Sequence, residues 1–305
     1  MDANGLGDKE AESKEPHDKH YTVLQREISS TDRLRYGAET YDAFMPEVDS
    51  KNGGDRSPYL VSRLFETNDE NLFNHVKFNL IKQTIDRLGI SNPKILDVGC
   101  GLQVARHYLQ KLGIECRYFG IDYEHSFNPD AVVDLNDPDT LKDVLPWEPD
   151  VVLVLDVLEH LHEEPAQIEN VVKNLRGVIG DNSEVIITLP QLYRMDRFKL
   201  DHLHYPEHKI RLRQDEWKSI LETSFDISEV QGLGYLSVIP YLPMLSKRYK
   251  PDNRLGHLFN YLRGTFFEWQ GFKPLDLWLS NTIGKLKMFK TISNDIYCIA
   301  RPKKQ

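Results

Sequence analysis

Three acidic residues in the middle of the chain each stand at the end of a run of mostly apolar residues. Asp97 ends "KILD", Asp122 ends "YFGID" and Asp134 ends "AVVD". Two glycines, Gly99 and Gly101, follow closely after the first acid. Glycines at such a point let a ligand approach the backbone, because no side chain stands in the way. This pattern indicates a site for a nucleotide-like cofactor.

The second and third acids suit an adenosine. The Asp122 carboxylate can accept hydrogen bonds from both ribose hydroxyls, and Asp134 can accept one from the adenine amine, with the backbone N–H of Leu135 beside it. Either acid could instead serve only a helix cap or a turn, Asp134 because it precedes "NDPD". A dinucleotide fingerprint fits poorly because Val104 replaces its last glycine, and the Gly-Lys-Ser/Thr ending of a polyphosphate loop is absent.

These acids can act together only if one sheet brings their strand ends to the same edge. From Lys94 to about Gly234, strand-like runs alternate with helical ones, which predicts a parallel sheet with helices on both faces. "FDISEVQGLG" and "SNDIYCIARP" predict a late antiparallel pair at the sheet edge. The long aromatic-rich segment between them, 235–292, is expected to be a helical insert.

Composition and charge restrict the class of protein to which this chain can belong. The chain has 305 residues, of which 40% are hydrophobic, and a net charge of −9 with a pI near 5.7, which argues against a nucleic-acid binder. Residues 1–20 are expected to be a disordered tail, 21–90 a helical segment and 91–305 the main domain. Three cysteines are too few for a disulfide framework. With no signal peptide or membrane span in sight, a cytoplasmic protein is expected.

Four segments, "ILDVGCG", "FGIDY", "VVDLND" and "VVLVLDVLEHL", follow one another along the chain. In this order they resemble the class I S-adenosylmethionine-dependent methyltransferases, of the small-molecule type with an Asp-x-x-Glu-His element. The resemblance covers roughly Lys94 to Leu189 and extends more weakly to Pro302. It implies a Rossmann-like α/β fold with a seven-stranded, mostly parallel sheet. It also implies S-adenosyl-L-methionine as the cofactor and methyl transfer as the reaction.

The resemblance also assigns contacts with the cofactor. Asp97, Gly99 and Gly101 would line its methionine part, while Asp122 would hold the ribose and Asp134 the adenine amine. The neighbouring residues expected in the same site are Cys100, Tyr123, Leu135, Asp156 and Val157. The family usually has a glycine where this chain has Gln103, whose side chain could fold away or bond the cofactor carboxylate.

Methyl transfer to an alcohol or amine needs a base that removes a proton. In the family, the loop after the fifth strand faces the acceptor, and here that loop contains His202 and His204. A histidine there could be the base because its pKa lies near neutrality. His160, in "LEH", is a third catalytic candidate, with a structural role as the alternative.

Two groups of residues have the chemistry to bind a metal ion. Asp156, Glu159 and His160 resemble the acidic-histidine cluster of the ubiquinone-type O-methyltransferases, where a divalent ion assists the acceptor. The same "LEH" also occurs in metal-free relatives. A second group has a spacing that could wrap zinc: Asp201, His202, His204 and His208. No further cluster supports zinc, and a site without metal is expected.

The preferred hypothesis is O-methylation of a small molecule such as a sugar, lipid or secondary metabolite. One alternative is a macromolecule methyltransferase, which the acidic charge and the lack of an Asn-Pro-Pro-aromatic motif disfavour. Another is a non-catalytic binding or assembly protein, because Gln103 interrupts the glycine loop. Aromatic residues of 235–292 could line an apolar or sugar acceptor pocket, or could lie on a membrane surface.

Overall fold

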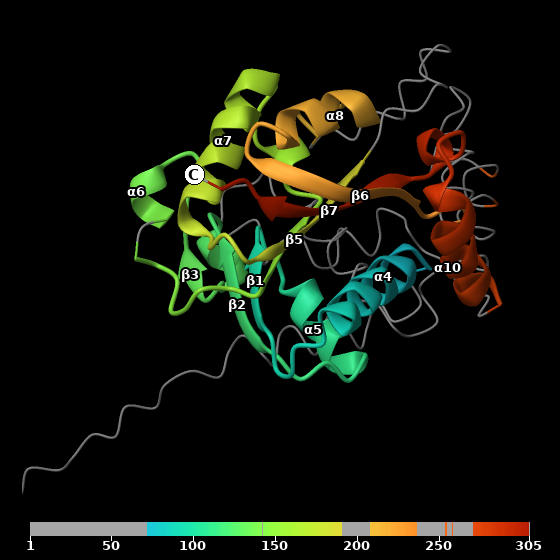
Figure 1. The fold of residues 1–305 in the computed structure, drawn as a ribbon, viewed down its shortest axis with the longest axis horizontal. Coiled ribbons are helices and arrows are strands. Elements are labelled where there is room, and N and C mark those ends of the chain that lie inside the picture. The colour runs from blue at the N-terminus through green and yellow to red at the C-terminus, as the bar shows by residue number, and fades with distance from the viewer. Residues whose placement is uncertain are drawn as a thin grey trace, which may run out of the picture.

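A seven-stranded sheet of order β3-β2-β1-β4-β5-β7-β6 forms the centre of the computed structural model (Figure 1). The structure describes residues 72–141, 143–190, 208–236, 254, 258 and 271–304. Its strands are β1 (Lys94–Val98), β2 (Arg117–Asp122), β3 (Ala131–Val132), β4 (Val151–Leu155), β5 (Glu184–Pro190), β6 (Phe225–Leu233) and β7 (Asp295–Pro302). The first five run parallel, and β7 runs antiparallel to both of its neighbours.

The strand directions bring the candidate residues to one edge of the sheet. Parallel pairing places the ends of β1, β2, β4 and β5 together. Because β7 runs the other way, it begins at this edge, where Asp295 pairs with Pro190 on one side and Leu233 on the other. We call this edge, where β1, β2, β4 and β5 end, the carboxyl edge. It is where open parallel sheets bind ligands.

Helices cover both faces of the sheet (Figure 1). The helices α4 (Leu72–Leu88), α5 (Val104–Lys111) and α10 (Phe272–Thr282) pack on one face, and their apolar side chains share a core with β1 and β4. The helices α6 (Pro138–Leu141), α7 (Pro165–Val178) and α8 (Gln214–Leu221) cover the other face over a second core. The α/β fold class that the sequence predicts is therefore confirmed.

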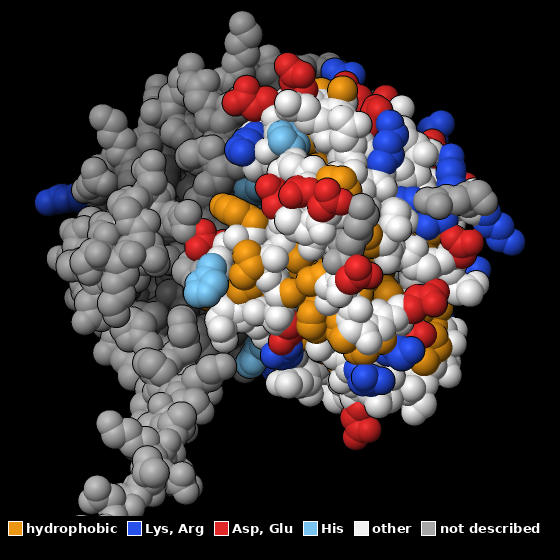
Figure 2. All heavy atoms as spheres, turned by 90° about the vertical axis from the view of Figure 1, so that its left-hand side faces the viewer, with side chains coloured by type: hydrophobic (Ala, Val, Ile, Leu, Met, Phe, Trp, Pro, Cys, Tyr) orange, Lys and Arg blue, Asp and Glu red, His pale blue; other side chains and the backbone are white. Residues whose placement is uncertain are grey.

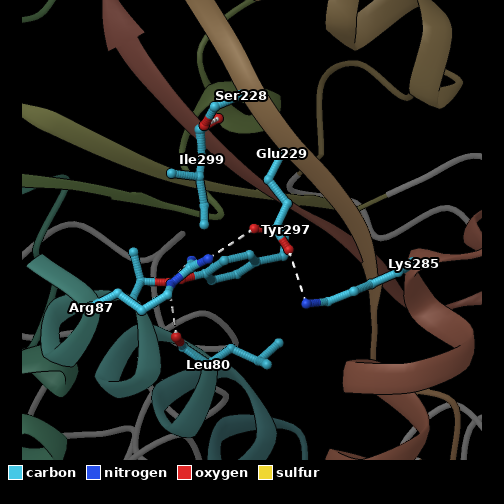
Figure 3. A network of polar contacts seen from close by, with 8 residues as sticks. Leu80, Arg87, Ser228, Glu229, Lys285, Tyr297 and Ile299 are labelled. Carbon is cyan, nitrogen blue, oxygen red and sulfur yellow. Dashed lines mark hydrogen bonds and ion pairs between the residues drawn. The ribbon is translucent and has the colours of Figure 1, made fainter.

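Polar contacts tie α4 to the last two strands (Figure 3). The Thr84 hydroxyl lies 2.9 Å from the hydroxyl of Tyr297 in β7, and Arg87 forms a 3.2 Å ion pair with Glu229 in β6. Lys285 approaches Glu229 from the other side at 3.3 Å. It belongs to η7 (Ile283–Lys285), a short 3-10 helix. These contacts hold α4 at a fixed position against the sheet.

The late strands confirm the expected antiparallel pair, with β6 as the edge strand and β7 inside the sheet. The helix expected at "DPDTLKDVL" is shorter than its pattern, because α6 spans only Pro138–Leu141. Of the 235–292 insert, the part from Phe272 to Ile292 is mainly helical. Residues 1–71 and 237–253 lie outside the described part of the chain.

Figure 2 views the molecule from the side of β3 and α6. On this face the described basic side chains alternate with acidic ones and with hydrophobic ones. Within the described ranges, no helix is both long and apolar enough to cross a bilayer.

Candidate functional site

A tight turn connects β1 to α5 at the carboxyl edge. Gly99 has a φ of 68° and Gly101 a φ of 49°, both in the left-handed region that glycine adopts without strain. The backbone N–H groups of Gly99 and Cys100 both donate to the carbonyl of Ile121, at 2.8 and 3.0 Å. The turn is thus held against the end of β2.

The Asp122 carboxylate fixes the same turn from β2. Its Oδ2 accepts the N–H of Gly101 at 2.9 Å, and its Oδ1 accepts the N–H of Glu124 at 2.9 Å. A carboxylate has about four lone-pair positions, so these two hydrogen bonds do not by themselves use the full acceptor capacity of Asp122. Asp122, the residue that the sequence predicts to hold the ribose, therefore lies directly beside the glycine turn.

Asp97 is buried at 3% exposure below this turn, and the Tyr118 hydroxyl donates a hydrogen bond to its Oδ2. Burial raises the pKa of the Asp97 carboxyl to about 7, because the hydrogen bond from Tyr118 offsets only part of the desolvation and the nearby Asp122 raises the pKa further. A carboxylate in this position is stabilised by any cation that binds beside it.

The two glycines of the turn face different surroundings. A Cβ atom on Gly99 would lie 2.6 Å from Cγ2 of Val157, so Val157 packs directly on the turn. Among the described residues, no heavy atom lies within 4 Å of a Cβ built on Gly101, although Gly101 itself is buried. The described atoms therefore leave space at the Cβ position of Gly101, whereas Gly99 is needed for packing.

Gln103 folds away from the turn. Its side-chain Nε2 donates to the backbone carbonyl of Asn128 at 2.9 Å, and its φ of 57° is left-handed. This is one of the two outcomes expected for the residue that replaces the usual glycine. Cys100 also has a packing role, since its Sγ would lie 2.9 Å from a Cβ at Gly120, and burial raises the pKa of its thiol well above the usual range.

The remaining adenosine candidates differ in exposure. Tyr123 is 67% exposed, whereas Leu135 is buried. The Asp134 carboxylate is exposed and accepts hydrogen bonds from the backbone and side-chain N–H groups of Asn136, at 2.9 and 2.8 Å. Asp134 therefore stabilises a turn in this structure, and an adenine contact would have to form in addition to these bonds.

Asp156 lies in a buried charge network. Its Oδ2 contacts Lys77 Nζ of α4 at 2.5 Å, and its Oδ1 accepts the hydroxyl of Thr188 at 2.7 Å. Burial opposes the charge, but Lys77 and these hydrogen bonds outweigh it and lower the pKa of Asp156 to about 2. Burial and the charge of Asp156 raise the pKa of the adjoining Asp295 well above its usual range. We therefore assign a charged Asp156 and a protonated Asp295 that donates to it.

Glu159 and His160 belong to η3 (Leu158–His160), a 3-10 helix that follows β4. Glu159 is fully buried, and its Oε1 lies 3.6 Å from Nε2 of His160 and 3.8 Å from Nε2 of His208. The two imidazole rings meet edge to face, with centroids 4.7 Å apart. Among the described residues, these three side chains form a group that could bind a metal ion.

The structure joins residues that the sequence treats separately. His160 and His208 come together, although the sequence assigns them to different groups. Lys77 and Asp295 are functional candidates that sequence reasoning missed, because a lysine in an amphipathic helix and an acid at a strand start give no signal by themselves. The two favoured base candidates, His202 and His204, lie outside the described residues.

A scan of protein-family models and a search of curated proteins found no match to this chain. Among solved structures, it is similar to a SAM-dependent methyltransferase from Archaeoglobus fulgidus, with 16% identity over 74% of this chain and 94% of that chain and a TM-score of 0.42. It is also similar to the N-methyltransferase NodS from Bradyrhizobium japonicum WM9, solved in complex with S-adenosyl-L-homocysteine. There the identity is 12%, the coverage is 93% of this chain and 98% of that chain, and the TM-score is 0.43.

A third similar structure is the magnesium protoporphyrin IX methyltransferase ChlM from Synechocystis PCC 6803 with bound S-adenosyl-L-homocysteine. It has 14% identity over 53% of this chain and 80% of that chain, with a TM-score of 0.39. Identities of this order say nothing about activity or substrate. The fold is assigned from the strand order of the chain and does not depend on these similarities.

Proposed function

We propose that this chain is an S-adenosylmethionine-dependent methyltransferase. The observation that carries the proposal is the arrangement around the glycine turn at the carboxyl edge. Buried Asp97 and Asp122 flank the turn, and the described atoms leave space at the Cβ position of Gly101. One acid suits the ammonium group of the methionine part and the other suits the ribose hydroxyls, as the resemblance in the four sequence motifs implies.

When bound, the cofactor supplies an electrophilic methyl group on a sulfonium. The chain's own residues would bind and orient it: Asp97 by charge, Asp122 by hydrogen bonds, and Val157 by packing on the turn. The acceptor must then approach from the same edge, and the sequence offers His160 after β4 and His202 and His204 in the segment after β5 as candidate bases. We propose one of these three histidines as the general base.

For the acceptor we propose a small molecule and an oxygen nucleophile. The acidic net charge and the mixed charges on the face in Figure 2 favour a small molecule over a nucleic acid. Described parts of the insert expose large hydrophobic side chains, including Trp278 at 57% and Met288 at 74%. These suit an apolar or sugar-like acceptor, or contact with a lipid surface from which such an acceptor is taken.

Calorimetric titration with S-adenosyl-L-homocysteine tests the proposal against the non-catalytic alternative. The wild-type chain should bind, and Asp122→Ala should weaken binding by roughly 1.5–3 kcal/mol, the scale for hydrogen bonds to a charged acceptor. Asp122 also holds the turn, so Asp97→Asn serves as a second variant that leaves the Gly101 bond to Asp122 in place. Asp226→Ala is the matched control, because Asp226 is an exposed carboxylate at the opposite end of the sheet.

Unchanged affinity in both Asp97→Asn and Asp122→Ala would remove the assigned roles. A wild-type chain that binds neither S-adenosylmethionine nor its product at millimolar concentration would overturn the enzyme proposal.

A further inference from the structure

Glu159, His160 and His208 hold three potential ligand atoms in a small space. These atoms all lie within 4.8 Å of one another, and Oε1 of Glu159 is 3.6 and 3.8 Å from the two imidazole Nε2 atoms. Two ligands that bind one ion at about 2.1 Å are separated by about 3.0–3.4 Å in octahedral or tetrahedral geometry. Small rotations of the side chains would therefore suffice to place one ion between them.

The backbone builds this cluster from two distant segments. The N–H of His160 donates to the carbonyl of Val157 at 3.0 Å, which closes the turn that presents Glu159 and His160. The N–H groups of Lys209 and Ile210 both donate to the carbonyl of Glu159, at 2.8 and 3.3 Å. These bonds fix the backbone next to His208 against Glu159, so the third side chain is held beside the first two by the fold.

We propose that Glu159, His160 and His208 bind a divalent transition-metal ion. Two imidazoles and one carboxylate suit Zn²⁺, Mn²⁺, Fe²⁺ or Co²⁺, whereas Mg²⁺ prefers oxygen ligands. Glu159 is fully buried, so its carboxylate is held in one place beside the two imidazoles. Asp156 is not part of this set, because Lys77 and Thr188 hold its carboxylate.

Three protein ligands leave coordination positions open for an outside group. The cluster follows β4 at the carboxyl edge, as does Val157, which packs on the glycine turn. An ion there can bind an acceptor hydroxyl and lower its pKa, so that the proton passes to a water molecule before or during transfer, and His160 then serves as a ligand and not as the general base. This role rests on the proposed methyltransferase function, whereas the binding of the ion does not.

Binding can be measured on the full chain after removal of metals with a chelator. Zn²⁺ or Co²⁺ is added by equilibrium dialysis, and the bound ion is determined by elemental analysis and by Co²⁺ absorption. We expect about one ion per wild-type chain and a loss of affinity of roughly 100-fold or more in Glu159→Gln and His208→Ala. His162→Ala is the matched control, since His162 lies two residues from the cluster but contacts Asn136.

His208→Cys separates a lost ligand from a lost fold. A thiolate also binds Co²⁺ and Zn²⁺, so this variant should restore binding and add a thiolate-to-cobalt absorption band that His208→Ala lacks. A wild-type chain that takes up no ion, or variants at Glu159 and His208 that bind like wild type, would overturn the proposal. Titration with S-adenosyl-L-homocysteine on the same samples reports on the cofactor site separately, so the failure of one proposal is distinguishable from the failure of the other.

Discussion

Asp97 is a buried carboxyl group beside the open glycine turn, and its burial has a cost in stability. Burial raises the pKa of Asp97 to about 7, above the value of 3.8 in an unfolded chain. The folded state therefore binds this proton more tightly, and it loses stability as the pH rises from about 4 to about 7. Above pH 7 both states are ionised, and the penalty stays constant.

Asp97→Asn should remove this penalty, because an amide oxygen can still accept the Tyr118 hydrogen bond. We expect the variant to be more stable than wild type by roughly 2–4 kcal/mol at pH 8 and about equal at pH 4. Urea unfolding at the two pH values measures the difference. A gain that does not change with pH would show that Asp97 does not titrate in this range.

The Lys77–Asp156–Asp295 network makes a second prediction about single residues. Lys77→Met leaves the ionised, partly buried Asp156 without its cation, and should cost about 2–4 kcal/mol. Asp295→Asn replaces a protonated carboxyl by a neutral amide that can still donate to Asp156, and should cost no more than about 1 kcal/mol. Equal losses in the two variants, measured by urea unfolding at pH 7, would contradict the assigned protonation.

The sequence predicts those site residues whose position depends only on neighbouring residues in the chain. The glycine turn, the acids at the ends of β1 and β2, and Val157 all follow apolar runs, so their place could be predicted. Lys77 could not be predicted as a site residue, because its contact with Asp156 depends on how α4 packs across the sheet. The same holds for His208, which reaches Glu159 only through the backbone bonds of Lys209 and Ile210.

At the scale of elements, the turn between β1 and α5 combines packing and openness. Gly99→Ala would drive a Cβ into Val157 at a φ of 68°, and should destabilise the fold by roughly 2–3 kcal/mol. Gly101→Ala meets no such contact and should cost about 1 kcal/mol for its left-handed backbone. Its affinity for S-adenosyl-L-homocysteine should nevertheless fall at least about 10-fold, because the new methyl group fills the space open to the ligand.

Thermal unfolding and calorimetry on this pair of variants separate the two roles. If Gly101→Ala binds like wild type, the cofactor does not approach the backbone at this position. If Gly99→Ala is as stable as wild type, the packing of Val157 on the turn does not require a glycine at position 99.

At the scale of the whole molecule, the insert between β6 and β7 has a described part that belongs to the core. The backbone N–H groups of Tyr235 and Leu236 donate to Oδ1 of buried Asp276, and Leu277 packs into the core beneath α4. Removing all of 235–292 would therefore damage the fold. Because Leu236 contacts Asp276 of α10, a short linker from residue 236 to residue 271 can replace residues 237–270 and leave these contacts in place.

This shorter chain should fold and bind S-adenosyl-L-homocysteine with wild-type affinity, because the described cofactor residues lie outside the deleted range. It should transfer no methyl group, because we expect the deleted aromatic residues to form one wall of the acceptor pocket. Circular dichroism, calorimetry and transfer of a labelled methyl group to the wild-type acceptor provide the three readouts. Full transfer by the shortened chain would exclude the acceptor role of this segment.

The most direct measurement is a crystal structure of the full chain grown with S-adenosyl-L-homocysteine. The account predicts the ligand at the carboxyl edge of the sheet, with its amino group beside Asp97 and its ribose hydroxyls hydrogen-bonded to Asp122. The backbone at Gly101 should lie in contact with it, and Val157 should keep its packing on Gly99. A ligand bound at another place, or a glycine turn that stays empty at a saturating concentration of the ligand, would contradict the account.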